Sequence, residues 1–303
     1  MNKPAFRKPK TTRLRVTEPQ ELMEFLSNKM GGMTRTSVKS LLSHRQVQVN
    51  NRIETKYNFL LNTGDIVTIN SGIANEELKH PKLKIIYEDD AIVVVEKKEG
   101  LLTMATVRES NEMTAYSILK SYLKKGNPRA ELYTVHRLDR ETSGILLFAK
   151  TKDVQFSMQS HWHEIVTKRC YVALVEGEPG KNDDTIISWL TENKKSYKIH
   201  SSWTNNGGQK AITHYTLLQS NGAYSLLSIE LETGRKNQIR VQLAAIGHPV
   251  VGDKKYGSGN SPIKRLALHA QILEFIHPMT HKVMHFETPI PKEFKGLLKE
   301  KAQ

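Results

Sequence analysis

The chain has 303 residues, with 45 Lys and Arg against 31 Asp and Glu and a formal net charge of +14. This length suits about two domains, and the basic excess favours a polyanion such as nucleic acid as partner. The single cysteine, Cys170, excludes an intramolecular disulfide and a zinc site built on a cysteine pair. Apolar runs such as residues 144–149 are far shorter than the roughly 20 residues that span a bilayer, so we expect no membrane segment.

Residues 1–14 combine basic side chains with prolines and contain no apolar stretch that could serve as a signal-peptide core. We therefore expect a basic flexible arm at this end of the chain. The lack of a cysteine pair suits a reducing compartment, and we expect a cytoplasmic protein.

Two helices are predicted next. Thr17 begins a capping-box pattern, with Pro19 in the first turn and Gln20 three residues after the cap. A second helix is predicted from about residue 34 to residue 43, and it leaves basic side chains exposed where they could face phosphates. The candidate phosphate-binding residues are Arg35, Lys39 and Arg45.

A hairpin and a closing strand follow the helices. The sequence VQVNNRI, residues 47–53, alternates around Asn50 and Asn51, a pair typical of tight hairpin turns. The sequence NTGD then leads into a strand over residues 66–69. This pattern resembles the S-four type RNA-binding domain over residues 15–70, although His44 stands where that family usually has Gly. The resemblance implies that the exposed basic residues of the second helix bind RNA.

Residues 71–82 mix glycine, proline and charges with little periodicity, and we expect a linker there. Residues 83–303 then contain many strand-like and few helix-like segments. This arrangement predicts an α+β fold with a large mixed, mainly antiparallel sheet rather than a doubly wound one. The predicted strands are residues 83–87, 91–95, 168–175, 211–218, 224–231 and 266–275, and a helix is predicted over residues 114–123.

The stretch HRLDRETSGILLFAK, residues 136–150, sets Asp139 between Arg137 and Arg140. Asp139 could pair with one of these arginines in a turn, an interaction that is common and weak at surfaces. His136 and Asp139 could instead bind a metal, but no matching ligand set stands at a recognisable spacing elsewhere. A protein-kinase catalytic loop also begins His-Arg, but here the acid comes one residue later and no other kinase motif is present.

Taken whole, this stretch closely resembles the catalytic motif of the RluA-type pseudouridine synthases. Three further segments match that family in its order: RCYVALVEG at 169–177, ETGRKNQIRVQLAAIGHPVVGDKKYG at 232–257 and RLALHAQILEFIHP at 265–278. With a weaker match at EKKEGLL, they cover most of residues 83–291. The resemblance implies an isomerase that turns uridine into pseudouridine in a central RNA-binding cleft. Because substrate and product are isomers, we expect no metal or other cofactor.

The resemblance also assigns roles to individual side chains. Asp139 would be the catalytic carboxylate, acting at the sugar carbon, at the ring or by proton abstraction. Arg240 would pair with Asp139 and keep it ionised. Tyr171 would stack on the extruded base, and Arg137 would contact the nucleotide backbone or fill the vacated space. Ile239, beside Arg240, completes the predicted substrate-binding set.

The residues alone leave other interpretations open. Arg240 could lie on a solvated helix face, although the apolar stripe through Ile239 argues for partial burial of that helix. Tyr171 could fill a strand, and Arg137 could pair with Glu141. The chain also has Asn237 and Gln242 where histidines are common in the family. Both side chains can donate hydrogen bonds, so we expect that they can still contact RNA.

The pairing of the two domains favours large-subunit ribosomal RNA as the substrate, with tRNA as the alternative. A non-catalytic RNA-binding or ribosome-assembly factor with the same fold is a rival interpretation. A metal-dependent RNA hydrolase is a second rival, which the missing ligand set disfavours. We expect a monomer with no protein partner.

Overall fold

This computed structural model describes residues 11–31, 33–43, 46–70, 78–105, 112–257 and 261–299. The chain divides into two compact units. The N-terminal unit consists of Met1–Leu78 with Ile118–Glu131, and the C-terminal unit consists of Lys79–Ser117 with Leu132–Gln303. Most of the predicted linker, residues 71–77, and the candidate residue Arg45 lie outside the described residues.

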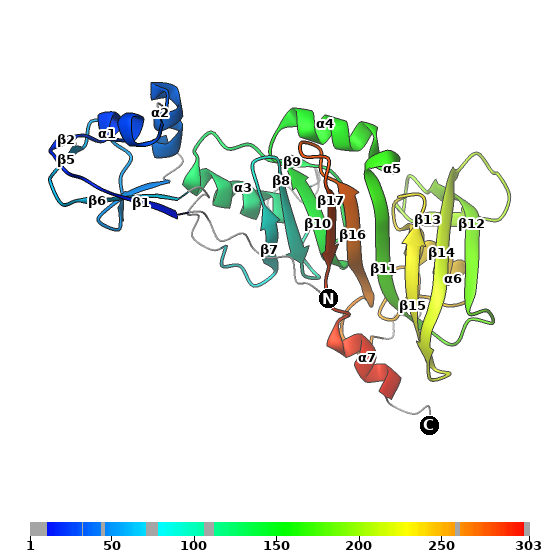
Figure 1. Cartoon of the computed structure of the whole chain (residues 1–303). Helices are drawn as coiled ribbons and strands as arrows, with labels where there is room; N and C mark the ends of the chain where they lie inside the picture. Colours follow the sequence, from blue (N-terminus) through cyan, green and yellow to red (C-terminus); the bar gives the residue numbers. More distant parts are fainter. Residues whose placement is uncertain are drawn as a thin grey trace. The chain divides into compact units, whose positions relative to one another are not determined.

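Short helices and strands build the N-terminal unit (Figure 1). The helices are α1 (Leu22–Lys29) and α2 (Arg35–Ser43), and the strands are β1 (Thr11–Arg15), β2 (Gln20–Glu21), β3 (Val47–Val49), β4 (Arg52–Ile53), β5 (Leu60–Leu61) and β6 (Ile66–Asn70). Strands β1, β6, β3 and β4 form one sheet, and β2 pairs with β5. Phe25 of α1 and Val38 of α2 are buried in a shared core with Val47 and Val67 of the first sheet.

The predicted hairpin turn is confirmed. Asn50 and Asn51 have φ values of 50° and 66°, the left-handed conformation that a two-residue hairpin turn requires. The Asn50 amide also donates to Asp65 at 2.8 Å and accepts from the Ile66 backbone N–H at 3.0 Å. These hydrogen bonds connect the turn to the start of β6, the strand with which β3 pairs.

The predicted start of the first helix is wrong. Helix α1 begins at Leu22, and the preceding residue, Glu21, makes no side-chain cap. The first backbone N–H groups of the helix, at Leu22 and Met23, donate instead to the carbonyls of Phe59 and Tyr57 at 2.8 and 3.0 Å. These distant carbonyls satisfy the donors that a local cap would otherwise satisfy, so the capping pattern at Thr17 is not used.

Residues 11–15 form strand β1, which pairs antiparallel with β6 along its whole length. The predicted boundary between a flexible arm and the N-terminal domain, at residue 15, therefore falls inside this strand. The strand is held in place because Leu14, whose side chain is partly buried, packs against the N-terminal core, and Val16, just after the strand, is buried in that core.

A single large sheet dominates the C-terminal unit (Figure 1). Its main strand order is β13-β12-β14-β15-β11-β16-β10-β8-β7, with β17 beside β16 and β9 beside β10. The strands are β7 (Leu83–Glu88), β8 (Ile92–Lys97), β9 (Tyr133–Thr134), β10 (Ser143–Ala149), β11 (Val166–Glu176), β12 (Asp183–Glu192), β13 (Ile199–Ser202), β14 (Gln209–Ser220), β15 (Tyr224–Leu231), β16 (Leu268–Ile276) and β17 (Val283–Glu287). The helices are α3 (Ala115–Gly126), which passes into the N-terminal unit, α4 (Lys152–Ser160), α5 (Trp162–Ile165), α6 (Gln238–Ala245) and α7 (Lys292–Lys299).

The α+β prediction is confirmed, because the paired strands run antiparallel except for β10 with β16. That parallel pair is only two residues long, with Ser143 opposite His269 and Gly144 opposite Ala270. Gly144 has a φ of 118°, and a Cβ atom there would lie 2.2 Å from the Ala270 carbonyl oxygen. Only glycine therefore permits this close approach at the centre of the sheet.

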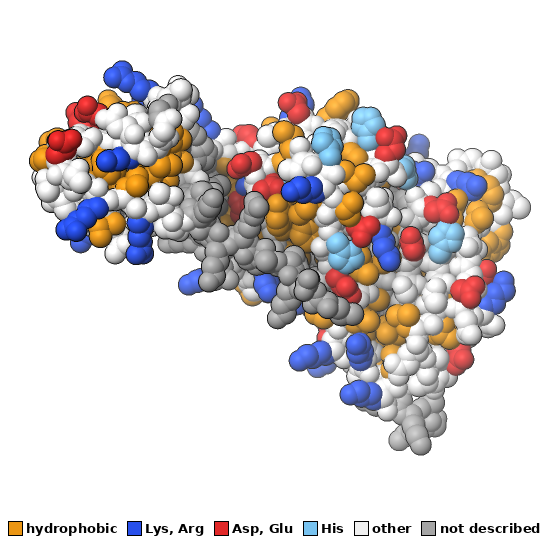
Figure 2. Space-filling view, in the orientation of Figure 1, with side chains coloured by type: hydrophobic (Ala, Val, Ile, Leu, Met, Phe, Trp, Pro, Cys, Tyr) orange, Lys and Arg blue, Asp and Glu red, His pale blue; other side chains and the backbone are white. Residues whose placement is uncertain are grey.

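The outer surface mixes charges of both signs. On the face shown in Figure 2, basic side chains are scattered among acidic ones rather than gathered in one patch. Within the described part of the chain, no helix is both long and apolar enough to cross a membrane.

Candidate active site

Asp139 lies in the loop between β9 and β10, which we call the acid loop (residues 135–142). Its side chain is 29% exposed, so it can reach a ligand. The backbone of the preceding residue, Leu138, is held by the buried side chain of Thr103. The Thr103 hydroxyl donates to the Leu138 carbonyl at 2.8 Å and accepts from the Leu138 N–H at 3.1 Å. The acid loop is thus fixed by hydrogen bonds from a distant segment.

Lys97 holds the other end of the acid loop. Its ammonium group is fully buried at the end of β8 and donates to the carbonyls of Lys98, Leu101 and Arg140 at 3.1, 2.8 and 3.1 Å. Burial lowers the pKa of Lys97 to about 7, although nearby Glu141 and Asp139 oppose the shift. A buried ammonium group is tolerated here because three carbonyl oxygens accept its hydrogen bonds. Through these bonds Lys97 joins the EKKEGLL segment to the acid loop.

Arg240, on α6, bridges two carboxylates. Its Nε and Nη2 atoms donate to Asp253 at 2.7 and 2.8 Å, while its Nη1 atom lies 3.5 Å from Asp139. The Asp253 side chain is completely buried, and burial alone would raise its pKa. The Arg240 hydrogen bonds and two backbone N–H groups outweigh burial and lower it. The structure therefore brings Arg240 to Asp139, but the strong partner of Arg240 is Asp253, which sequence reasoning missed.

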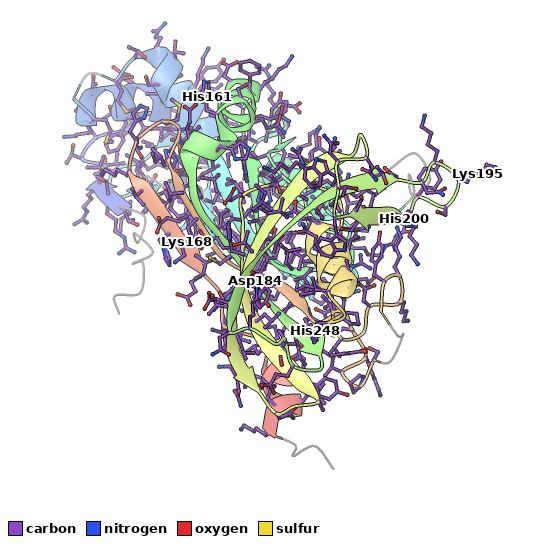
Figure 3. The ribbon with its side chains drawn as sticks, turned by 90° about the vertical axis from the view of Figure 1, so that its right-hand side faces the viewer. His161, Lys168, Asp184, Lys195, His200 and His248 are labelled. Atoms are coloured by element: carbon purple, nitrogen blue, oxygen red, sulfur yellow. The ribbon has the colours of Figure 1, made fainter. Side chains whose placement is uncertain are left out.

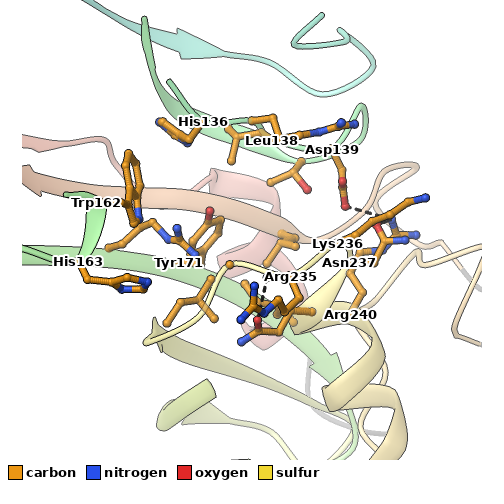
Figure 4. Close-up of a pocket in the computed structure, with 18 residues that line it drawn as sticks. His136, Leu138, Asp139, Trp162, His163, Tyr171, Arg235, Lys236, Asn237 and Arg240 are labelled. Atoms are coloured by element: carbon orange, nitrogen blue, oxygen red, sulfur yellow. Dashed lines mark hydrogen bonds and ion pairs between the residues drawn. The ribbon is translucent and has the colours of Figure 1, made fainter. Parts of the chain in front are cut away.

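Asp139, Tyr171, Arg137, Ile239 and Arg240 all line one cavity of about 430 Å³, within the size range of small-ligand pockets. Figure 4 shows Asp139 joined to Arg240 by a dashed line on one side of the cavity, with Tyr171 and Trp162 toward the other side. The other lining residues include His136, Leu138, Thr142, His163, Arg169, Leu231, Gly234, Arg235, Lys236, Asn237, Gln238 and Leu268.

Tyr171 comes from the middle of β11 and is 7% exposed. Its pKa is raised, mainly because the ring is buried, so the phenol stays neutral. Ile239 is 5% exposed and contributes an apolar surface to the cavity, whereas Arg137 is exposed. An aromatic face, an apolar wall and an exposed cation thus line the same cavity as the carboxylate.

His136 supports the wall of the cavity. The Leu147 backbone N–H donates to its Nε2 atom at 3.1 Å, and its ring lies 5.3 Å from the Trp162 ring. Burial, with a smaller effect of Arg169, lowers the pKa of His136 to about 3. The ring is therefore neutral with a proton on Nδ1, and its other nitrogen is engaged by the backbone.

We next consider the alternative that His136 and Asp139 bind a metal. Among the residues that the structure describes, no three His, Cys, Asp or Glu side chains come together where they could share a metal ion. In the histidine-rich C-terminal segment, buried His277 bonds to Asp89 at 2.8 Å and exposed His285 to Glu274 at 3.0 Å.

Gln242 does not contact the cavity, contrary to expectation. It is fully buried, its carbonyl accepts from Thr213 at 2.6 Å, and its amide donates to Ser188 and the Ala211 carbonyl at 2.9 and 3.0 Å. Because these bonds use the side chain to fix α6 on the sheet, no RNA contact is left for it. Asn237 does line the cavity, and its amide donates to the Tyr256 hydroxyl at 3.0 Å.

The turn between β12 and β13 joins the same region. Lys255 donates to the Tyr197 carbonyl at 2.7 Å, and the Ile199 N–H donates to the Tyr256 hydroxyl at 3.0 Å. Figure 3 shows Lys195 at the tip of this turn, pointing away from the sheet. Asn237 and the turn are therefore connected through the Tyr256 hydroxyl, which accepts hydrogen bonds from both.

Two of the arginines in the motif differ in environment. Arg140 forms a two-point ion pair with Glu112 at 2.8 and 3.0 Å, which gives it a structural role. Arg137 lies at the exposed edge of the cavity. In the N-terminal unit, Arg35 and Lys39 are exposed on α2, as predicted, and Lys39 lies 5.5 Å from the Tyr57 ring centroid.

Comparison with known proteins identifies the class of enzyme. Residues 91–245 match the family model described as RNA pseudouridylate synthase, and residues 22–67 match the S4 domain. The chain belongs to the RNA pseudouridylate synthase family, whose members are isomerases that act on RNA. The family predicted from the catalytic motif is thus confirmed.

Several relatives align over most of the chain. It is 35% identical to an RNA pseudouridine synthase of Mycoplasma pneumoniae over 93% of each protein. It is 30% identical to ribosomal large subunit pseudouridine synthase D of Haemophilus influenzae, over 92% of this chain and 90% of the relative. Among solved structures, human RNA pseudouridylate synthase domain containing 4 matches with a TM-score of 0.58 at 23% identity, over 71% of this chain and 91% of the human one.

Proposed function

We propose that this enzyme isomerises one or more uridines of large-subunit ribosomal RNA in the cytoplasm, with Asp139 as the catalytic carboxylate. The observation that carries the assignment of Asp139 is its position in the cavity, partly exposed and facing Arg240, with Tyr171 alongside. A carboxylate in this setting can act as nucleophile or base.

Each neighbour has a distinct part in this proposal. Tyr171 stacks on the extruded uracil, a contact that contributes about 1 to 3 kcal/mol toward unstacking the base. Ile239 excludes water beside the reacting atoms, and Arg137 contacts the RNA backbone. Arg240 pairs with Asp139 at 3.5 Å, while Asp253 fixes the position of the guanidinium.

The choice of RNA rests on the relatives and on the domain pairing. Two relatives, from Nitrosomonas europaea and Haemophilus influenzae, are named ribosomal large subunit pseudouridine synthase D. An S-four-like domain near residues 15–70, joined through residues 71–82 to a catalytic domain, would add RNA contacts outside the cavity. We propose a monomer, and tRNA is the alternative substrate.

The test is to map pseudouridines in ribosomal RNA and tRNA from a strain that lacks the gene, then restore the gene as wild type or as Asp139→Asn. We expect a site in large-subunit RNA that returns with wild type only, because the amide cannot act as nucleophile or base. Asp184→Asn, at a half-buried carboxylate on β12 labelled in Figure 3, is the matched control and should restore the site fully.

The rival functions give different results. If Asp139→Asn restores pseudouridine as wild type does, Asp139 is not the catalytic group. A non-catalytic assembly factor would rescue growth with either variant and leave no missing pseudouridine, and a metal-dependent hydrolase would cut RNA until chelator is added. A site that disappears from tRNA alone would replace the ribosomal assignment.

A further inference from the structure

Arg169 lines the cavity together with Arg137, Arg235 and Arg240, and it has no part in the roles proposed above. It lies on β11 two residues before Tyr171, and because alternate residues of a strand face the same side, both side chains line the cavity. Its Nη2 atom donates to the Thr233 carbonyl at 3.1 Å, and its guanidinium carbon lies 5.9 Å from the Trp162 ring centroid.

In contrast to Arg240 and Arg140, Arg169 has no acidic partner among the described residues. Arg240 is paired with Asp253 and Asp139, and Arg140 with Glu112. Arg169 makes a single hydrogen bond to a carbonyl, and its Nε atom is buried with no acceptor within the described part of the chain. A partly buried cation without a counter-charge is unfavourable in the free protein, which points to a ligand that supplies negative charge.

The guanidinium is nevertheless held in a fixed place. Gly234 packs against it so closely that a Cβ atom there would lie 3.1 Å from Nη2 and 3.2 Å from Nη1. The Thr233 carbonyl and the Trp162 ring bound it on other sides. Its charge also reaches the neighbouring rings, since it opposes protonation of His136 and favours ionisation of Tyr171. The Arg169 guanidinium is thus a preorganised positive charge in the same cavity as Tyr171, next to the place where the stacked base would lie.

We propose that Arg169 binds a carbonyl oxygen of the target uracil and stabilises the negative charge that the ring acquires during the reaction. This inference rests on the proposed function. When the bond from N1 to C1′ breaks, its electron pair stays on the uracil and spreads over N1, O2 and O4. C5 then bonds to C1′, C5 loses its proton and N1 gains one, so the product is an isomer. Attack by a carboxylate on the ring would also place charge on O4, so Arg169 is needed on each route.

The test uses the full chain and a synthetic RNA stem-loop that carries the uridine mapped above, with a second RNA that has an abasic ribose at that position. We expect Arg169→Met to lower the single-turnover rate at saturating enzyme by about 100-fold, the size of effect seen when one donor to a developing anion is removed. Affinity for either RNA should change less than about threefold. Lys168→Met, which removes an exposed charge one residue away (Figure 3), is the matched control and should keep the wild-type rate.

Two outcomes overturn the inference. A saturating rate within twofold of wild type would show that Arg169 does not act on the ring. Equal loss of affinity for the uridine and abasic RNAs with an unchanged saturating rate would identify a phosphate contact instead. If Arg169→Met does not fold, Arg169→Lys decides, with a rate about tenfold lower expected because the planar fork is lost. Failure of the proposed function looks different, since the wild-type protein would then form no pseudouridine.

Discussion

At the scale of single residues, the site is organised by side chains that never need to touch the RNA. Asp253 orients Arg240, and Thr103 fixes the backbone of Leu138. Lys97 donates hydrogen bonds to three carbonyls, one of which is that of Arg140 in the acid loop. These groups turn a loop into a rigid support, which is what a reacting carboxylate requires.

Lys97 should give the protein a measurable dependence on pH. Its folded-state pKa of about 7 lies below the ordinary value of 10.5, so between these values the unfolded chain binds more protons. The free energy of unfolding should therefore rise with pH above about 7, approaching about 1.4 kcal/mol per pH unit from this group. Urea unfolding at pH 7, 8 and 9 measures the slope, and Lys97→Met should remove this part of it. Identical slopes in the two proteins would contradict the depressed pKa.

The same residues explain why the site was only partly predictable. Asp139, Tyr171 and Arg240 were identifiable because each belongs to a local motif. Lys97 and Arg140 are 43 residues apart, and Arg240 and Asp139 are 101 residues apart. Contacts at such separations leave no periodic signal in the sequence, and the pairing of Arg240 with Asp139 was predicted only from the family resemblance. Asp253, 13 residues from Arg240, and Arg169 both lie within the family motifs, but neither was assigned a role.

At the scale of elements, local pattern was a good guide where an element is decided locally. The Asn50–Asn51 turn, α2 and the aliphatic strands β8, β11 and β15 were predictable for that reason, whereas β10 was quoted only as an apolar run. Helix α1 starts where distant carbonyls accept its first N–H groups, so its local cap signal misled. Strands β12 and β13 contain more polar than apolar residues and were missed, as were the short strand β17 and helices α4, α5 and α7.

Gly144 offers a test of the central strand pairing. Gly144→Ala should lower the free energy of unfolding by at least about 3 kcal/mol, because a Cβ atom would meet the Ala270 backbone and the φ of 118° is unfavourable for alanine. Gly296→Ala is the matched control, since its added Cβ meets nothing within 4 Å in helix α7. We expect that control to unfold like wild type or slightly later. Equal unfolding of the two variants would mean that β10 and β16 are not held so closely.

At the scale of the whole molecule, the net charge of +14 is distributed over both units rather than concentrated. We expect the helix-borne pair Arg35 and Lys39 to contact phosphates, and each lost phosphate contact should reduce the slope of log affinity against log salt by about 0.7 to 0.9. The double variant Arg35→Ala, Lys39→Ala should therefore reduce the slope by up to about 1.8, as measured by filter binding of ribosomal RNA fragments.

The matched control for this measurement is Lys295→Ala with Lys299→Ala. These exposed lysines have the same spacing on helix α7 of the C-terminal unit and remove the same charge. A similar decrease in both double variants would mean that net charge, and not the position of α2, controls binding.

The short pairing of β10 with β16 also links the acid loop to the sheet. Beyond Gly144 these two strands are no longer paired, and the backbone N–H of Leu147 donates to the ring of His136 at 3.1 Å. That amide proton can exchange with solvent only when His136, three residues before Asp139, moves away. Deuterium uptake at Leu147 therefore reports how often the acid loop opens, and it gives a view of active-site motion from a residue at the centre of the sheet.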